Sequence, residues 1–278
     1  MAWAPNSRAL AVASAGGLTL HDAATLKPLA ALEGHSGPVK SIAVNSDGTQ
    51  IVSGSADTTV RVWHLRAGGL RQALQGHTDA VDAVALRASD ALVASGGADK
   101  QIRLWDAVTY EVVRVLIGHE REITSLAFCS GGALLASGGW DNTVRLWDVE
   151  TGVLRATLRH DDWVRHIAAS LDGRQIASAS RDTNVRLWDV ASGEQKLRIQ
   201  AHDAGVDCVA FSPDGSLLGT GGRDHAVRFW RLPDGKALFD LHRHDKPVLA
   251  LAFSPDGTRL ATGSGDNTVR VWAIGEDG

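Results

Sequence analysis

The sequence predicts an all-β protein built from similar units of about 42 residues, each folded as a small antiparallel sheet. Six tryptophans recur at intervals of 42, 42, 41, 42 and 42 residues, and each ends a segment of the pattern apolar–Arg–apolar–Trp. A histidine stands 28 residues before each of these tryptophans and an aspartate stands six before it. Internal repeats of this length are typical of stacked or ring-closed supersecondary units.

The repeated positions form six quartets, each made of a histidine, a serine or threonine, an aspartate and a tryptophan. The quartets are His35, Ser53, Asp57, Trp63; His77, Ser95, Asp99, Trp105; His119, Ser137, Asp141, Trp147; His160, Ser178, Asp182, Trp188; His202, Thr220, Asp224, Trp230; and His244, Thr262, Asp266, Trp272. Their constant spacing indicates one fold element copied six times.

One unit shows the strands that we expect. Residues 122–128 alternate apolar with polar or small side chains, which is the period of a strand. Residues 133–138 are almost all apolar or small, as in a strand buried on both faces. Residues 143–147 and 153–158 complete four strands, and the connecting segments carry the Gly, Asp and Ser residues that favour turns.

A single four-stranded sheet cannot bury two apolar faces, so neighbouring sheets must pack face to face, as in a β-propeller. Several dipeptides carry a family resemblance: Gly34-His35, Gly76-His77, Gly118-His119, Trp105-Asp106, Trp147-Asp148 and Trp188-Asp189. With them the chain resembles the WD-repeat (WD40) β-propeller family over nearly its whole length. The resemblance implies a rigid propeller, and it implies that the quartets are structural.

We expect seven blades in one domain of residues 1–278, with a degenerate first blade and a last blade that lacks its outer strand. In the first unit His21 replaces the repeated tryptophan and Ala15 replaces the aspartate. The alternative is six blades with residues 1–25 as an appendage. The expected blades are residues 1–33, 34–75, 76–117, 118–158, 159–200, 201–242 and 243–278.

The composition restricts the cellular compartment and the classes of partner that we expect. The net charge is −4, from 28 basic and 32 acidic residues, so the whole molecule has no electrostatic attraction to nucleic acid or to an anionic membrane. No run approaches the ~18 apolar residues that membrane insertion requires. Two cysteines, Cys129 and Cys208, and the lack of a secretory signal predict an intracellular, cytoplasmic protein, with the nucleus as the alternative.

Serine, histidine and aspartate in one unit could suggest a hydrolase triad. A nucleophile needs one exposed hydroxyl beside one base, whereas this sequence has six equivalent sets. We therefore interpret the quartets as hydrogen-bonded scaffolding and expect no catalytic residue. The repeated arginines, two residues before each tryptophan, are also interpreted as scaffold, with their charged heads at the rim. No cofactor or metal is expected, because His242 and His244 have no further ligands at zinc-like spacing.

Binding in a repeat protein is expected where the register is constant and the side chain is not. Two such positions, beside the turn aspartate and at the start of the first strand, carry unusual residues in the later units: Trp140, Trp163, Arg165, Arg181, Asp207 and Arg223. Trp and Arg are enriched at binding hot spots. One interpretation is a top-face site for an acidic or phosphorylated peptide. The other interpretation is that the tryptophans cover the mouth of the channel at the centre of the propeller, while the arginines pair locally with Asp161, Asp162 or Asp207.

The function expected from these features is a non-catalytic scaffold that presents a rigid surface to protein or peptide partners. We expect a monomeric propeller within a multiprotein complex. The alternatives are a metal-dependent hydrolase or lactonase-like propeller enzyme, and a nucleic-acid-associated subunit. The sequence leaves open which partner is bound and whether the chain is part of a longer protein.

Overall fold

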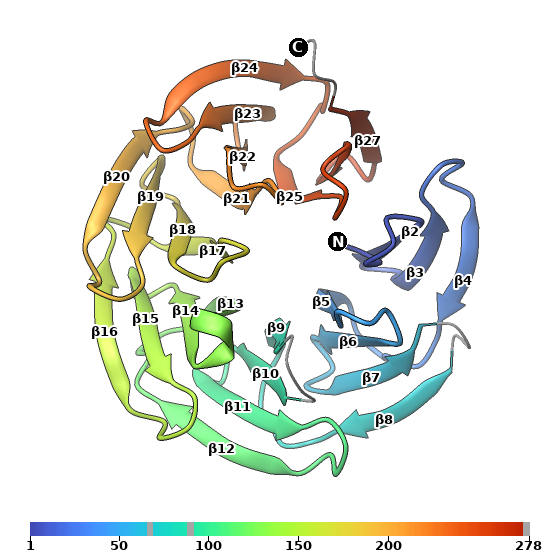
Figure 1. The fold of residues 1–278 in the computed structure, drawn as a ribbon. Helices are drawn as coiled ribbons and strands as arrows, with labels where there is room; N and C mark the ends of the chain where they lie inside the picture. The colour runs from blue at the N-terminus through green and yellow to red at the C-terminus, as the bar shows by residue number, and fades with distance from the viewer. Residues whose placement is uncertain (66–68, 88–91, 275–278) are drawn as a thin grey trace. The chain divides into compact units, whose positions relative to one another are not determined.

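A computed structural model describes residues 1–65, 69–87 and 92–274. These residues form 27 strands in seven antiparallel sheets, together with one short 3-10 turn, η1 (Ser130–Gly132) (Figure 1). The predicted all-β fold of seven propeller blades is confirmed. The chain divides into two compact units, Met1–Leu126 and Ala127–Gly278. Whether all 278 residues make one domain with the expected blade limits stays a prediction.

The first unit contains three sheets, whose strands follow one another in chain order. They are β1 (Ala2–Trp3), β2 (Ala9–Ser14), β3 (Gly17–Asp22) and β4 (Pro28–Leu32); β5 (Val39–Val44), β6 (Gln50–Ser55), β7 (Val60–His64) and β8 (Leu70–Leu74); and β9 (Val81–Leu86), β10 (Leu92–Gly97), β11 (Gln101–Asp106) and β12 (Val112–Ile117). Residues 1–25 contribute three strands of a four-stranded sheet, so the six-blade alternative is wrong.

The remaining sheets begin with β13 (Ile123–Cys129), a strand that crosses the division between the units. The fourth sheet adds β14 (Leu134–Gly139), β15 (Thr143–Asp148) and β16 (Leu154–Arg159). The others are β17 (Val164–Ala169), β18 (Gln175–Ser180), β19 (Asn184–Asp189) and β20 (Gln195–Gln200); β21 (Val206–Phe211), β22 (Leu217–Gly222), β23 (Ala226–Arg231) and β24 (Lys236–His242); and β25 (Val248–Phe253), β26 (Arg259–Ser264) and β27 (Val269–Ala273).

The first and last sheets depart from the regular pattern as predicted. Strand β1 has only two residues, and the last sheet has three strands. In the first sheet, His21 replaces the repeated tryptophan and makes purely local contacts, to Thr19 Oγ1 (2.9 Å) and to the carbonyl of Leu26 (3.1 Å). The first sheet therefore lacks the buried polar link that the repeated tryptophan makes elsewhere.

Apolar side chains between successive sheets form the core. In the second unit, Val144 and Leu146 of the fourth sheet pack with Val164, Ile167 and Ile176 of the fifth. Equivalent clusters join the fifth sheet to the sixth and the sixth to the seventh. The second strands β14, β18 and β22 are buried on both faces, which explains their almost uninterrupted apolar or small composition.

Glycine is required where two sheets approach most closely. A Cβ atom at Gly138 would lie 2.7 Å from Cγ1 of Val164 in the next sheet, and one at Gly221 would lie 2.7 Å from Cγ1 of Val248. Both distances are below van der Waals contact, so a side chain there would push the sheets apart. The abundant glycine of the second strands therefore serves packing.

No helix within the described residues has the length and apolar character to cross a membrane.

Candidate functional site

The quartets of His35, His77, His160, His202 and His244 share the same chain of hydrogen bonds. The imidazole Nε2 lies beside the hydroxyl and Nδ1 beside the aspartate, and the indole Nε1 donates to the same hydroxyl. The three distances, in that order, are 2.8, 2.8 and 2.8 Å at His35; 2.7, 2.8 and 2.7 Å at His77; 2.6, 3.1 and 2.7 Å at His160; 2.9, 2.7 and 3.0 Å at His202; and 2.9, 2.9 and 2.9 Å at His244. In the fourth sheet Trp147 Nε1 donates to Ser137 Oγ at 2.8 Å.

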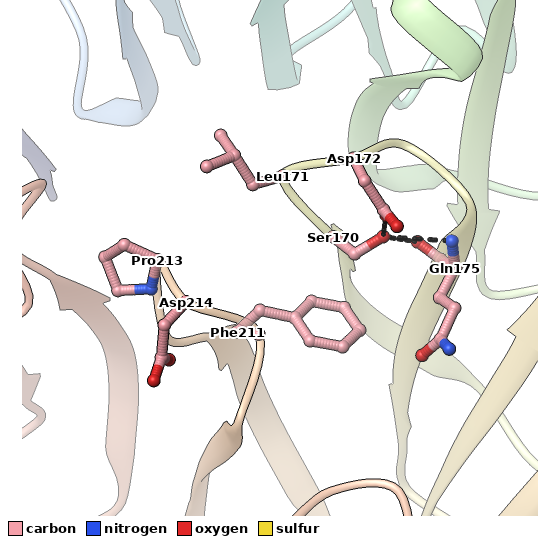
Figure 2. Close-up of a pocket in the computed structure, with 8 residues that line it drawn as sticks. Ser170, Leu171, Asp172, Gln175, Phe211, Pro213 and Asp214 are labelled. Atoms are coloured by element: carbon pink, nitrogen blue, oxygen red, sulfur yellow. Dashed lines mark hydrogen bonds between the residues drawn. The ribbon is translucent and has the colours of Figure 1, made fainter.

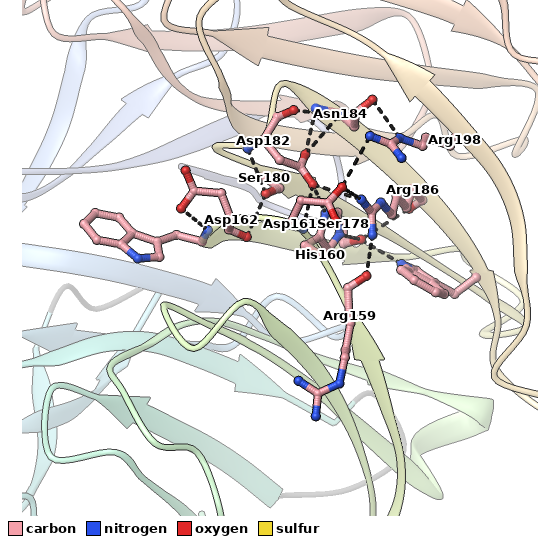
Figure 3. A network of polar contacts seen from close by, with 12 residues as sticks. Arg159, His160, Asp161, Asp162, Ser178, Ser180, Asp182, Asn184, Arg186 and Arg198 are labelled. Atoms are coloured by element: carbon pink, nitrogen blue, oxygen red, sulfur yellow. Dashed lines mark hydrogen bonds and ion pairs between the residues drawn. The ribbon is translucent and has the colours of Figure 1, made fainter.

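The serine or threonine hydroxyl is at the centre of each hydrogen-bonded quartet. The neighbouring groups determine which atom donates and which accepts in each of these hydrogen bonds. Trp188 Nε1 donates to Ser178 Oγ, and the carboxylate of Asp182 accepts from His160 Nδ1 (Figure 3). A neutral histidine protonated at Nδ1 can only accept at Nε2, so the hydroxyl donates to it. Ser178 has no exposed surface. A substrate could reach such a hydroxyl only if the sheet opened.

Burial and hydrogen bonding determine the charge states of the histidine and the aspartate in a quartet. Burial lowers the pKa of His160 and of His202, which keeps both rings neutral at neutral pH. Burial raises the pKa of Asp224, but His202, through its charge once it is protonated in acid and through its hydrogen bond, together with the hydrogen bond of Arg228, outweighs burial and lowers that pKa to about 2. The same competition leaves the pKa of Asp182 well below its ordinary value. Asp182 and Asp224 are therefore ionised acceptors.

The repeated arginines differ from the sequence-based expectation. Their heads do not simply project at the rim, because Arg103 Nη1 lies 2.9 Å from Asp99 Oδ2 and Arg228 Nη1 lies 2.6 Å from Asp224 Oδ2. Arg186 Nη2 reaches both Asp182 (3.1 Å) and Asp161 (2.6 Å). These arginine–aspartate pairs could have been predicted from the sequence, since each repeated arginine follows its quartet aspartate by four residues.

Hydrogen bonds beside the quartet of the fifth sheet fix the loop that carries the predicted site residue Trp163. Ser180 Oγ donates to the carbonyl of Asp162 at 3.0 Å, and the backbone N–H of Arg181 donates to the carbonyl of Trp163 at 2.9 Å. The loop before β17 is thus joined to the turn after β18 (Figure 3). This backbone bond places the side chains of Trp163 and Arg181 beside each other.

The structure brings all six predicted site residues into one surface of the second unit, here called the Trp–Arg patch: Trp140, Trp163, Arg165, Arg181, Asp207 and Arg223. The indoles of Trp140 and Trp163 stack with centroids 4.8 Å apart and an angle of 15°. The guanidinium of Arg181 lies over the Trp163 ring, 4.8 Å from its centroid. Two stacked rings capped by a cation form a rigid, flat platform.

A buried carboxylate holds the other two arginines of the Trp–Arg patch. Asp207, whose side chain is 3% exposed, lies 3.0 Å from Nε of Arg165 and 3.4 Å from Nε of Arg223. Gly205 lies between the two exposed arginines, because a Cβ atom built there would be 3.4 Å from Arg181 Cα and 3.7 Å from Arg223 Cδ. The backbone of Arg181 and the side-chain stem of Arg223 therefore both lie beside Gly205.

The local pairing proposed as the alternative is present in this geometry. Arg181 Nε lies 3.7 Å from Asp162 Oδ2, and Asp207 serves both other arginines. Yet the side chains of Arg181 and Arg223 remain 50% and 45% exposed. Three guanidinium groups face two carboxylates, which leaves one positive charge. The patch can therefore offer both stacking surface and charge-assisted donors to an anionic group.

The histidine pair considered as a metal site, His242 and His244, is engaged by aspartates: His244 Nδ1 lies 2.9 Å from Asp266 Oδ2. His242 contacts Asp240 at 2.8 Å on the exposed strand β24. Within the ranges that the structure describes, no group of three or more His, Cys, Asp or Glu residues could hold a metal ion.

Comparison with known proteins places the chain in a family. The family profile "WD domain, G-beta repeat" matches six segments, residues 26–64, 68–106, 110–148, 152–189, 193–231 and 235–273, which together cover most of the chain. The chain belongs to the WD40 repeat family. WD40 propellers generally serve as platforms for protein interactions, which is the coarse role that membership supports.

Two similar proteins share only part of this WD40 chain. The "APC/C activator protein CDH1" of Saccharomyces cerevisiae is 40% identical over 68 residues, which is 23% of this chain and 12% of that protein. The "Ribosome biogenesis protein BOP1 homolog" of Oryza sativa subsp. japonica is 53% identical over 36 residues, 13% of this chain and 5% of that protein. The matches thus cover a small fraction of either relative.

Each WD40 repeat of the sequence begins one strand before a sheet of the structure begins, so the repeats and the sheets do not share their limits. The match over residues 193–231 contains β20, the outer strand of the fifth sheet, and β21 to β23 of the sixth. The other matches follow the same rule. The six matches contain every strand from β4 to β27, and β1 to β3 precede the first of them. Six repeats therefore correspond to seven sheets.

Removing one quartet hydroxyl should destabilise the protein. Ser178→Ala leaves Trp188 Nε1 and His160 Nε2 buried without their partner, so we expect a loss of about 1–3 kcal/mol in the free energy of unfolding. The matched control is Ser192→Ala, at an exposed turn, which should change that free energy by less than about 0.5 kcal/mol. Urea unfolding measures both. Equal midpoints for the two variants would contradict the role given to the chain.

Acidification should destabilise the fold in two pH windows. The folded pKa values of His160 and His202 are lowered, so the unfolded chain takes up their protons first as the pH falls through about 6.5. The folded pKa of Asp224 is also lowered, to about 2, and its stabilisation is present above about pH 3.9 and lost as the pH falls towards 2. Urea midpoints measured between about pH 8 and 3 should therefore fall steadily. A midpoint that stays constant or rises would refute this.

Proposed function

We propose that this WD40 protein is a non-catalytic scaffold that binds an acidic or phosphorylated segment of a partner protein through the Trp–Arg patch. The observation that carries the proposal is the stack of Trp140, Trp163 and Arg181. The regular quartets do not require these three side chains, since neither tryptophan belongs to the repeated register. Rigid aromatic surface beside arginine is the composition that interface hot spots favour.

The charges of the Trp–Arg patch support an anionic partner. Asp207 is buried and shared, so it orients Arg165 and Arg223 without neutralising both. The guanidinium of Arg181 is held over the Trp163 indole, which lowers the conformational entropy that the side chain loses when it binds a partner. The side chains of Arg181 and Arg223 are 50% and 45% exposed, so a carboxylate or phosphate of the partner could accept hydrogen bonds from either guanidinium.

Two other functions remain alternatives to the scaffold. A metal-dependent hydrolase or lactonase-like propeller would need a ligand set, and metal analysis of the purified protein tests it. A nucleic-acid-associated subunit would need free basic groups. Arg103, Arg186 and Arg228 of the repeated register are engaged by aspartates, which favours the scaffold over this second alternative. Binding to nucleic acid would show a steep dependence on salt.

The double variant Trp140→Ala/Arg181→Ala should weaken partner binding without unfolding the protein. Affinity capture from a cell extract, followed by mass spectrometry, identifies the partners of the unaltered chain. Synthetic peptides from those partners are then titrated against each variant. We expect the bound segments to be acidic or phosphorylated, and the double variant to bind at least about tenfold more weakly. The affinity should also fall as salt is raised.

The matched control is Arg155→Ala, which removes a similarly exposed arginine from the outer strand β16. It should retain every partner at unchanged affinity. If the double variant captures the same partners as the unaltered chain, the patch is not the binding site. If the captured segments are basic, the proposed chemistry of the partner is wrong.

A further inference from the structure

A second candidate surface lies at the opposite end of the same sheets from the Trp–Arg patch. Strand β17 (Val164–Ala169) directly follows Trp163 and directly precedes Ser170. Six residues at about 3.3 Å each separate its two ends by roughly 20 Å. A ligand at one end therefore leaves the other free.

The surface at this other end is a groove of about 520 Å³ between the β17–β18 and β21–β22 loops. It is called the Leu171 groove and is lined by Ser170, Leu171, Asp172, Gln175, Phe211, Pro213, Asp214 and Gly215. Figure 2 shows Leu171 and Pro213 on the two loops, with the Phe211 ring between them and Gln175. A groove of this size accommodates a bulky side chain with its neighbouring backbone.

The turn between β17 and β18 does not require an apolar side chain at Leu171. It is 85% exposed. The corresponding turns of the next two sheets have proline at this position, in Ser212–Gly215 and Ser254–Gly257, and proline suits such a turn. Single exposed apolar side chains are common on proteins, but this one borders a groove that also contains Phe211 and Pro213.

The rim of the Leu171 groove is acidic. Asp172 and Asp214 line it, and Asp214 and Asp256 line an adjoining hollow of about 370 Å³ on the other side of the Pro213 loop. None of the residues lining either space is basic; Arg174, whose charge acts on Asp172, is outside both linings. Hydrogen bonds from Ser170 and Ser212 lower the pKa of Asp172 and Asp214, so both stay ionised at neutral pH.

We propose that the Leu171 groove binds a protein segment in which a bulky apolar side chain is flanked by lysine or arginine. The apolar side chain lies against Leu171, Phe211 and Pro213, and the flanking cations lie beside Asp172 and Asp214. The carboxylates are exposed, so they contribute mainly specificity and association rate, while the apolar contact supplies the affinity. The chain then has two binding surfaces of opposite charge preference, one at each end of β17.

The test uses a random twelve-residue peptide library displayed on phage and selected in parallel on the full-length protein and on its Leu171→Ser variant. Leu171 is almost fully exposed, so the variant should fold normally. We expect peptides enriched only on the unaltered protein to combine a bulky apolar residue with flanking Lys or Arg. Synthetic copies should bind the variant at least about tenfold more weakly by calorimetry.

Several variants separate this surface from others. Leu154→Ser removes an exposed leucine from β16 and should leave the affinity unchanged. Trp140→Ala/Arg181→Ala should also leave it unchanged, so failure of the Trp–Arg patch would not affect this result. Asp172→Asn/Asp214→Asn keeps an acceptor oxygen for the turns and should weaken binding several-fold while reducing its salt dependence.

Three results would overturn the proposal. Identical peptides from both selections would show that Leu171 contributes nothing to binding. Selected peptides rich in Asp or Glu would contradict the charge preference. Sedimentation that shows a dimer of the unaltered protein and a monomer of Leu171→Ser would assign the groove to a second copy of this chain.

Discussion

The structure depends on a buried hydroxyl that serves two partners at once. In the fifth sheet, Ser178 Oγ accepts from the indole of Trp188 and donates to His160, which in turn donates to Asp182. Ser178, His160 and Trp188 are buried and the side chain of Asp182 is only 5% exposed, so these polar groups are tolerated because they satisfy one another. The cost of breaking one link explains why the same four residue types recur at fixed spacing.

The quartet also determines where the binding residues lie. In the fifth sheet Asp182 accepts hydrogen bonds from His160 Nδ1 and from the backbone N–H of Asp161, which ties the loop before the first strand to the turn after the second. The Trp–Arg patch uses that same loop and turn. Trp163 and Arg181 are therefore placed by the scaffold although they are not part of it. Substitution at these two positions, before the first strand and before the turn aspartate, can change the side chains that a blade exposes to a partner without disturbing the hydrogen bonds of the quartet.

The sequence was sufficient for most of the fold, because spacing alone located the quartets and the turns. In the fourth sheet the expected strands 122–128 and 153–158 lie within one residue of β13 and β16. The co-location of the six patch residues also followed from their register. The stacking of Trp140 on Trp163 did not, because it depends on how two neighbouring sheets are placed. Leu171 was missed for a related reason: a groove is a property of two loops, and the repeat pattern describes one at a time.

The offset between repeat and sheet bears on how such a chain can change length. A duplicated segment such as residues 193–231 would carry the outer strand of one sheet together with the three inner strands of the next. Recombination at these limits leaves each sheet assembled from two neighbouring copies, so no inserted copy can fold as a detached module. Successive copies are thereby interlaced along the backbone, and the gain or loss of one preserves the pairing on both sides of the junction.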